Sequence, residues 1–372
     1  MRALFSGRWF TTFGSMPLEQ RDGRVSGTYG NRAEGRLDGR IVGRGAHAAL
    51  RFRYEEPGER GTGTFRLRRS GRFEGTYRPA GTRVARRWDG HRGWDGLWES
   101  DFGRVRLAQD GERVSGSYAG AVGAALAGRA RGDVLRFRYR ERDGAGEGRF
   151  RLLPDGEHFE GEWRAAGRRA WKPWNGHRAQ ALPGITWLLV FEAHWQRGLG
   201  EPEYSYGGMV REVFSRLPSV RVRHRFFEDA PSLERWCAEL AFLPEPAILL
   251  LASHGLPGGL TVQGRLIDTR RVLRALAPVE NLRLLHFSSC LVGNDAARAM
   301  RGQPWPVSGY TTSVDWGASA LLEFTYLDLM LNRGLAPADA AAGLRVLAPY
   351  AGARAPRGSP YRAAGFRFFP AR

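Results

Sequence analysis

Two patterns of hydrophobic and polar residues divide this chain near residue 180. Before that point, short segments such as Arg24–Tyr29 and Arg72–Tyr77 alternate apolar and polar residues with a period of two. This alternation predicts β-strands with one buried face, and turn-forming residues such as Asp22 and Gly23 lie between them. After residue 180, continuous apolar runs alternate with amphipathic segments, which predicts alternating strands and helices.

The strand-rich half is a tandem repeat of two copies, which we assign to residues 1–92 and 93–180. Motifs that return in the second copy are Phe13–Gln20 as Phe102–Gln109, Val25–Tyr29 as Val114–Tyr118, and Trp88–Arg92 as Trp174–Arg178. Glycines inside the strands, among them Gly27 and Gly116, predict sharp bends or bulges. We therefore expect two small antiparallel barrels or strongly twisted sheets. The repeat resembles a glycine- and tryptophan-rich β module that is appended to other domains in bacterial proteins.

Each copy closes on a Trp, an Asp or Asn, a Gly, a His and an Arg. We interpret this segment as a closing strand whose Trp packs the barrel while its His and Arg are solvated. The alternative is a basic and aromatic ligand surface that includes His91 and His177. Because a catalytic site is rarely duplicated in full, a segment that both copies share favours a structural role for these residues over a catalytic role.

Residues 179–184 form a short boundary that contains Pro and Gly, and residues 181–372 form the third predicted domain. The predicted strands are Ile185–Glu192, Val220–Phe227, Ala247–Ser253, Leu282–Ser289 and one running from Val307 to Trp316. The predicted helices are Tyr204–Leu217, Pro231–Leu243, Asp268–Ala277, Asp295–Arg301, Ala318–Asn332 and Pro337–Leu347, with a hairpin over Gly258–Ile267. This order predicts an α/β domain with a mostly parallel sheet covered by helices on both faces. The fold class is therefore multidomain, with two all-β repeats followed by an α/β domain.

Two reactive side chains follow two of these predicted core strands. His254 comes directly after Ala247–Ser253, and Cys290 directly after Leu282–Ser289. Ligands bind at the carboxyl ends of the strands in an open parallel sheet, so both side chains are expected at one edge. A thiol beside an imidazole is a candidate nucleophile with its base.

A strand ending in Ser-His-Gly, a hairpin, a helix and a strand ending in Ser-Cys together resemble the caspase-like cysteine peptidases. Within that clan, residues 185–350 are most similar to the CHAT and separase-like branch. The resemblance implies a cysteine endopeptidase with a dyad of His254 and Cys290. It also implies an oxyanion hole made by the backbone N–H groups of Gly255 and Cys290.

The resemblance also suggests where specificity arises. It makes the segment from Ser308 to Trp316 the lining of the specificity pocket, so that Asp315 would favour Arg or Lys before the cleaved bond. The alternative for Asp315 is an N-cap of the following helix. Glu192, at the end of the first predicted strand of this domain, is a candidate for the other side of the cleft.

The remaining cysteine and histidines have simpler interpretations. Cys237 lies in the middle of a predicted helix beside Trp236 and Leu240, which is typical of packing. His286 lies in the middle of a strand and is expected to be a core residue. Two cysteines make no disulfide framework, and no Cys/His cluster has metal spacing, so we expect neither a metal nor a cofactor.

The formal net charge is +19, and a charge of this size would normally indicate an anionic partner such as nucleic acid. Only Lys172 among the 57 basic residues is a lysine, and this bias is typical of a GC-rich genome. We therefore do not expect a nucleic-acid partner, although the charge leaves one open. Residues 1–180 carry 36 basic and 22 acidic residues, so an anionic ligand would bind there.

The chain starts without the apolar core of a signal peptide, and its apolar runs are too short to span a membrane. We therefore expect a soluble cytoplasmic protein. The leading hypothesis is a cysteine endopeptidase that cleaves a protein or peptide, with β repeats that recognise a regulatory partner or restrain the protease. The resemblance implies a role in bacterial defence or programmed cell death. The alternative is an inactive caspase-like scaffold whose basic repeats bind an anionic partner.

Overall fold

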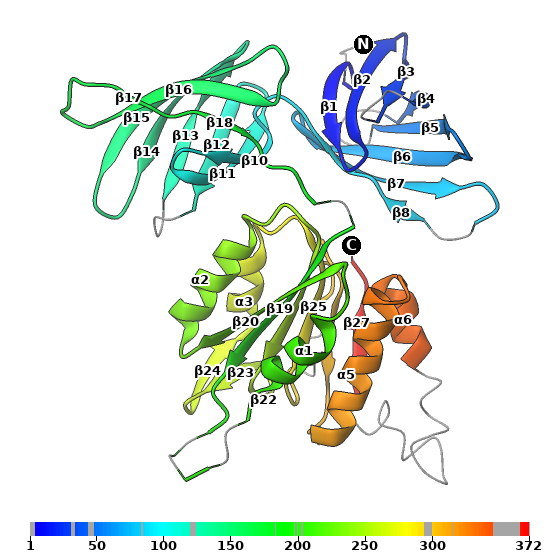
Figure 1. Cartoon of the computed structure of the whole chain (residues 1–372), viewed down its shortest axis with the longest axis vertical. Coiled ribbons are helices and arrows are strands. Elements are labelled where there is room, and N and C mark those ends of the chain that lie inside the picture. The colour runs from blue at the N-terminus through cyan, green and yellow to red at the C-terminus, as the bar shows by residue number, and fades with distance from the viewer. Residues whose placement is uncertain are drawn as a thin grey trace. The chain divides into compact units, whose positions relative to one another are not determined.

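The computed structural model describes residues 4–30, 34–43, 48–82, 85–119, 124–182, 184–196, 198, 200–201, 204–293, 300–314, 316–344 and 365–371. The chain divides into two compact units, Met1–Gln180 and Ala181–Arg372. The first unit carries two β-barrels, and the second carries a mixed sheet with helices (Figure 1).

The first barrel is built from the first repeat. Its strands are β1 (Gly7–Thr11), β2 (Gly14–Arg21), β3 (Arg24–Tyr29), β4 (Gly35–Val42), β5 (Ala49–Glu56), β6 (Glu59–Arg69), β7 (Arg72–Pro79), β8 (Arg86–Arg87) and β9 (Gly90–His91). Neighbouring strands pair antiparallel from β1 to β7, and β9 pairs with both β7 and β1. Eight strands therefore form a closed ring, and β8 adds to β7 outside it. A closed ring leaves no edge strand exposed.

The second barrel repeats this topology. Its strands are β10 (Gly96–Ser100), β11 (Gly103–Asp110), β12 (Arg113–Tyr118), β13 (Ala125–Arg131), β14 (Val134–Arg140), β15 (Ala145–Leu152), β16 (His158–Ala165), β17 (Lys172–Pro173) and β18 (Gly176–Arg178). Here β18 closes the ring between β16 and β10. The prediction was two small antiparallel barrels or strongly twisted sheets, and the structure shows that both repeats are barrels.

Strand glycines serve close packing in both barrels. A Cβ atom on Gly27 would lie 2.0 Å from the carbonyl oxygen of Pro17, and one on Gly116 would lie 2.3 Å from that of Arg106. The pairing register is continuous at both glycines. The glycines therefore allow neighbouring strands to approach closely, and no bulge occurs at either position.

An arginine closes each barrel by stacking on a tryptophan of the first strand. The Arg92 guanidinium lies 4.4 Å from the ring centroid of Trp9, and that of Arg178 lies 4.4 Å from Trp98. Arg178 is only 7% exposed, and its guanidinium donates to the carbonyl oxygens of Gly93, Asp95 and Gly156. The prediction that this arginine is solvated was wrong, because an aromatic face and loop carbonyls replace its water.

The second unit is organised around one six-stranded sheet. Its strands are β19 (Thr186–Ala193), β20 (Val220–Phe227), β21 (Ala247–Ala252), β25 (Leu282–Ser288), β26 (Val307–Tyr310) and β27 (Phe366–Phe369), in the order β20-β19-β21-β25-β26-β27. All neighbours pair in parallel except β26 and β27. A separate three-stranded sheet contains β22 (His254–Leu256), β23 (Gly259–Val262) and β24 (Arg265–Asp268).

Helices cover both faces of the six-stranded sheet. The helices are α1 (Tyr206–Phe214), α2 (Ala230–Leu240), α3 (Thr269–Leu276), α5 (Trp316–Leu331) and α6 (Pro337–Gly343). One core packs α2 and α3 on the sheet, and the other packs α1, α5 and α6 on the opposite face (Figure 1). The β21 residues Ile248 and Leu249 belong to different cores, which is why this strand is apolar throughout. No helix in the described part of the chain is long and apolar enough to cross a membrane.

The structure differs from the predicted elements at several points. The strand expected to reach Trp316 ends at Tyr310, because the backbone N–H of Thr311 turns to the carbonyl of Gly365. The edge strand β27 was not predicted, and the expected hairpin is part of a three-stranded sheet that includes His254. The helix predicted over Asp295–Arg301 lies mostly outside the described residues.

Candidate active site

His254 lies at the carboxyl end of β21, where the chain leaves the central sheet. All six residues of β21 are buried, and they carry the chain through the core to this edge. His254 is exposed and begins β22, where it pairs with Thr261. Its own backbone carbonyl accepts a hydrogen bond from Ser253 Oγ at 2.8 Å. The imidazole is therefore carried on paired backbone and remains open to solvent.

Cys290 follows the neighbouring parallel strand at the same level. Ala252 is the register partner of Ser288, so His254 and Cys290 each lie two residues beyond that pair. The Ser253 backbone N–H donates to Ser289 Oγ at 3.3 Å, which ties the two strand ends together. Cys290 is half-buried. The two predicted dyad residues thus extend from adjacent strands at one edge of the sheet.

Gly255 packs directly on the backbone of Cys290. A Cβ atom at position 255 would lie 2.1 Å from the Cys290 carbonyl oxygen and 3.0 Å from its nitrogen. Contacts this short do not occur between real atoms, so any other residue would separate the two segments. The glycine brings the two backbones that the resemblance assigns to an oxyanion hole into contact.

The segment after Cys290 is fixed to the end of β26. Leu291 has a φ of 62°, which is uncommon for a side chain of this size. Its backbone N–H donates to the Thr312 carbonyl at 3.1 Å, and that of Gly293 donates to the Tyr310 carbonyl at 2.7 Å. These bonds hold a backbone conformation that turns the chain sharply after Cys290.

The backbone N–H of Val314 points at the Cys290 thiol, with 3.4 Å between its nitrogen and Sγ. The thiol in turn donates to the Val314 carbonyl oxygen at 3.9 Å, so the backbone of Val314 contacts the sulfur through both of its polar groups. Asp315 follows Val314 directly but lies outside the described residues, so its predicted role in specificity stays a prediction.

An aromatic ring contacts the candidate base. The ring of Trp195 lies 5.1 Å from that of His254 between centroids, at 80°, which is an edge-to-face contact. Trp195 Nε1 in turn donates to the Glu192 carboxylate in a short hydrogen bond. Trp195 was not among the residues predicted for the site, because nothing in its local sequence indicates a tertiary contact with His254.

Glu192 has no exposed surface and holds the start of helix α1. Its carboxylate accepts from the backbone N–H groups of Tyr206 at 2.7 Å and Gly207 at 2.9 Å, and from Ser205 Oγ at 3.0 Å. His224 Nε2 lies 2.7 Å from it as an ion-pair partner. Burial opposes ionisation, but His224 and these donors lower the pKa of Glu192. Glu192 therefore contacts the candidate site through Trp195.

A buried polar cluster lies behind the Cys290 strand and is centred on Glu323 of α5. His286 Nε2 lies 3.1 Å from its carboxylate, Tyr310 Oη donates at 2.7 Å, and Ser288 Oγ donates at 2.9 Å. The Tyr206 hydroxyl donates to the same carboxylate. The cluster therefore joins α1, β25, β26 and α5 beneath the candidate nucleophile.

Opposing effects act on Glu323. Burial tends to raise its pKa, but the charge of His286 and the donated hydrogen bonds lower it overall. Burial, followed by the charge of Glu323, raises the pKa of Tyr310 well above its ordinary value. His286 is the satisfied core histidine that the sequence predicts. Glu323 was missed, although a carboxylate in an otherwise apolar stretch of helix is a signal of such a cluster.

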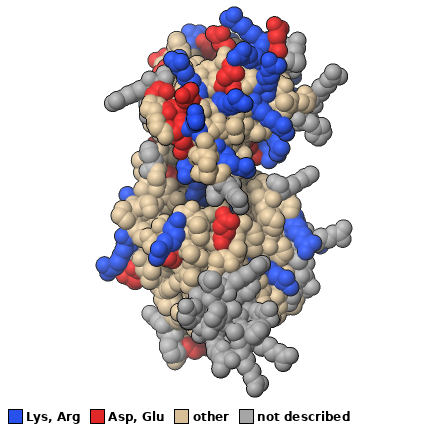
Figure 2. Space-filling model, turned by 90° about the vertical axis from the view of Figure 1, so that its right-hand side faces the viewer, with Lys and Arg blue, Asp and Glu red and all other residues tan. Residues whose placement is uncertain are grey.

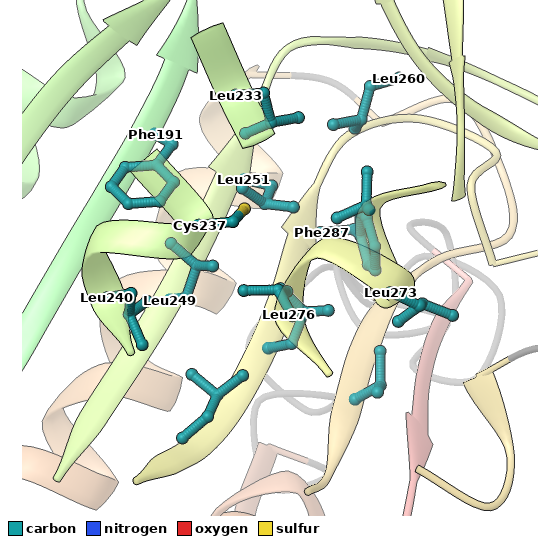
Figure 3. Close-up of a cluster of buried hydrophobic side chains, with 14 of the residues drawn as sticks. Phe191, Leu233, Cys237, Leu240, Leu249, Leu251, Leu260, Leu273, Leu276 and Phe287 are labelled. Atoms are coloured by element: carbon teal, nitrogen blue, oxygen red, sulfur yellow. The ribbon is translucent and has the colours of Figure 1, made fainter. Parts of the chain in front are cut away.

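The other cysteine lies in a different environment. Cys237 packs in the core among Phe191, Leu249 and Leu251 (Figure 3). Burial raises the pKa of its thiol to about 12, so it is an inert packing residue, as predicted. His194 stacks on Phe226 with 4.3 Å between ring centroids. No group of three or more Cys, His, Asp or Glu that could hold a metal occurs among the described residues.

Comparisons with known proteins leave the family open. No family model and no curated protein matches the chain. Among solved structures, intact Ap-TbpB with its N and C lobes matches at 9% sequence identity and a TM-score of 0.17. The match covers 42% of this chain, and the chain spans about half (54%) of that protein.

Proposed function

We propose that the second unit is a cysteine endopeptidase of the caspase-like clan, closest to the CHAT and separase-like branch. The observation that carries the proposal is the contact between Gly255 and the Cys290 backbone at the ends of two paired parallel strands. This contact supports an arrangement in which an exposed imidazole, a half-buried thiol and two backbone N–H groups share one edge of the sheet. These are the parts that acyl transfer needs.

In the proposed reaction, His254 takes the proton from the Cys290 thiol, and the sulfur attacks the carbonyl carbon of a peptide bond. The resulting oxyanion accepts hydrogen bonds from the N–H groups of Gly255 and Cys290. The C–N bond then breaks as His254 returns the proton to the departing amine. Water, deprotonated by His254, attacks the thioester, and the C–S bond breaks to release the acid and restore the thiol.

Trp195 is assigned a positioning role in this reaction, because its ring restricts His254 on one side. Asp315 is proposed to select Arg or Lys before the cleaved bond. The barrels are proposed to bind a regulatory partner or to restrain the protease. By the resemblance, the output is cleavage of a protein in bacterial defence or cell death.

Cleavage of a degenerate peptide library by the full chain tests the proposal, with products identified by mass spectrometry. We expect cleavage by the wild type, loss of all products with Cys290→Ala, and loss of at least about 10²-fold in rate with His254→Ala. Cys237→Ala is the matched control, since it removes a buried thiol outside the site. Products that persist unchanged in Cys290→Ala would overturn the proposal and favour the inactive-scaffold alternative.

A further inference from the structure

We propose that the outer face of the second barrel binds the phosphodiester backbone of a nucleic acid through a row of arginines on β12 to β15. This inference concerns the first unit and does not depend on the peptidase proposal. The strands β12 to β15 carry eight arginines and a single carboxylate, Glu147. The equivalent strands of the first barrel, β3 to β6, carry nine arginines and four carboxylates.

The row consists of Arg113, Arg129, Arg136 and Arg149, which we call the arginine row. The pairing register places Arg113 opposite Arg129, Arg129 opposite Arg136, and Arg136 opposite Arg149. All four side chains are exposed and share the outer face. Neighbouring strands are about 4.8 Å apart, so the row is a line of closely spaced positive charges across four strands.

This arrangement is unfavourable without a partner, because like charges directly opposite each other destabilise a sheet. Glu162 pairs with Arg149 at one end, and Glu112 Oε2 lies 3.8 Å from Arg129. Among the described residues, no ion pair involves Arg113 or Arg136, although Asp110 is the register partner of Arg113 on β11. The arginine row is therefore only partly neutralised by the protein itself.

The first barrel keeps three arginines of this row, as Arg24, Arg40 and Arg51, but it lowers the charge in two ways. There Arg24, the equivalent of Arg113, donates two hydrogen bonds to Asp38 at 3.0 and 2.8 Å. In the second barrel Ala127 replaces Asp38, so this neutralising carboxylate is lost. Thr64 in the first barrel corresponds to Arg149, so the second copy also gains a charge in the row. On the face drawn in Figure 2, acidic and basic side chains lie beside one another over the unit that carries the barrels.

A hollow of about 830 Å³ opens beside the row. It is lined by Ala127, Arg138, Arg140, Glu147 and Arg164, among others. The small side chain of Ala127 leaves space between the flanking arginines. Arg164 already donates to Glu147 in this hollow, so a phosphate group would meet the guanidinium groups of Arg138 and Arg140, which can bind its oxygens in pairs.

Several features favour nucleic acid over a lipid surface. A barrel is convex, so a flat bilayer would touch few of these arginines, whereas a polymer of phosphates can follow the row. Among the barrel residues that the structure describes, the exposed large hydrophobic ones are Phe13 and Phe102, both in turns and outside β12 to β15. Membrane-surface binding relies on apolar side chains that enter the lipid as well as on charge. Backbone contacts of this kind predict affinity without sequence preference.

Fluorescence anisotropy of labelled single-stranded DNA, single-stranded RNA and duplex DNA with the full chain tests this proposal across a salt series. We expect binding at low salt that weakens linearly on a log–log plot of affinity against salt. Arg136→Gln and Arg113→Gln should each reduce the slope by about 0.7 for a single strand or about 0.9 for a duplex. Comparison of the three affinities shows whether single-stranded DNA, single-stranded RNA or duplex DNA binds best.

Two matched variants make the test specific. Arg24→Gln removes the same charge at the equivalent but paired position of the first barrel, and should leave the slope unchanged. Ala127→Asp should weaken binding without removing any arginine, because it restores the carboxylate that the first barrel has. The proposal is overturned if no nucleic acid binds at low salt, or if Arg24→Gln weakens binding as much as Arg113→Gln. It is also overturned if vesicles of anionic lipid bind through the same arginines more tightly than every nucleic acid.

Discussion

Gly255 and Cys290 are in such close backbone contact that a Cβ atom on the glycine would lie 2.1 Å from the cysteine carbonyl oxygen. This contact joins the ends of β21 and β25, which carry the candidate base and the candidate nucleophile. It explains why a glycine follows the His in the sequence Ser-His-Gly, since only a residue without a Cβ atom permits the contact.

Gly255→Ala should therefore lower the peptidase rate by about 10²-fold or more, because the two segments must move apart and the proposed oxyanion donors lose their alignment. Initial rates on a substrate found in the library measure the effect. Gly144→Ala is the control, since a Cβ there meets nothing within 4 Å. An unchanged rate in Gly255→Ala would contradict the assigned oxyanion hole.

Trp195→Ala should reduce kcat by about ten-fold, a part of the 10²–10⁴ that a positioned acid–base group supplies. The physical reason is that His254 loses the ring that restricts it. The dependence of kcat/KM on pH should change in shape, whereas loss of folded protein would lower the whole profile uniformly. Trp195→Phe keeps a ring but removes the hydrogen bond to Glu192, so its kcat should lie between those of the wild type and Trp195→Ala.

Glu323→Gln should lower stability at neutral pH by about 3 to 5 kcal/mol, because it leaves His286 without its buried partner. The pKa of Glu323 is lowered in the folded state. The contribution of ionised Glu323 to stability is therefore complete at pH values above its ordinary pKa of 4.5. It is lost as pH falls through the lower pKa of the folded state. The difference between the urea midpoints of wild type and variant should shrink on acidification. A difference that stays constant from neutral pH down through this window would contradict the assignment.

Arg178→Met should destabilise the second barrel by about 2 to 4 kcal/mol, because three loop carbonyls lose their donor and Trp98 loses its cation. Arg92→Met should destabilise the first barrel less, since Arg92 is less buried and donates to two carbonyls. Thermal unfolding followed by tryptophan fluorescence measures both. Equal losses of stability in Arg178→Met and Arg92→Met would contradict the claim that burial sets how much the arginine contributes.

The alternation of residues was enough to predict two small antiparallel barrels or twisted sheets, and continuous apolar runs between amphipathic segments predicted most elements of the second unit. Val220–Phe227 was predicted with its observed bounds because Pro218 precedes it and Asp229 begins the next helix. The end of β26 at Tyr310 was not predicted, since Thr311 and Thr312 have the composition of a strand. Only the pairing with Gly365 turns the chain there.

Contacts between distant residues could not be read from local pattern. The burial of Arg178 depends on Trp98, 80 positions earlier, and the arginine row depends on the register of four strands. Composition suggested that the arginines reflect codon usage, and only the register reveals that four of them lie in line. Likewise, the link from Glu192 through Trp195 to His254 joins side chains whose local sequence carries no such signal.

The most direct measurement of the central claim is labelling of the full chain with a thiol-reactive peptide ketone that carries Arg before the reactive carbon. We predict a single adduct on Cys290, identified by intact mass and peptide mapping, that is absent in Cys290→Ala and at least about 10²-fold slower in His254→Ala. Labelling that occurs at Cys237, or that proceeds at the same rate without His254, would contradict the account.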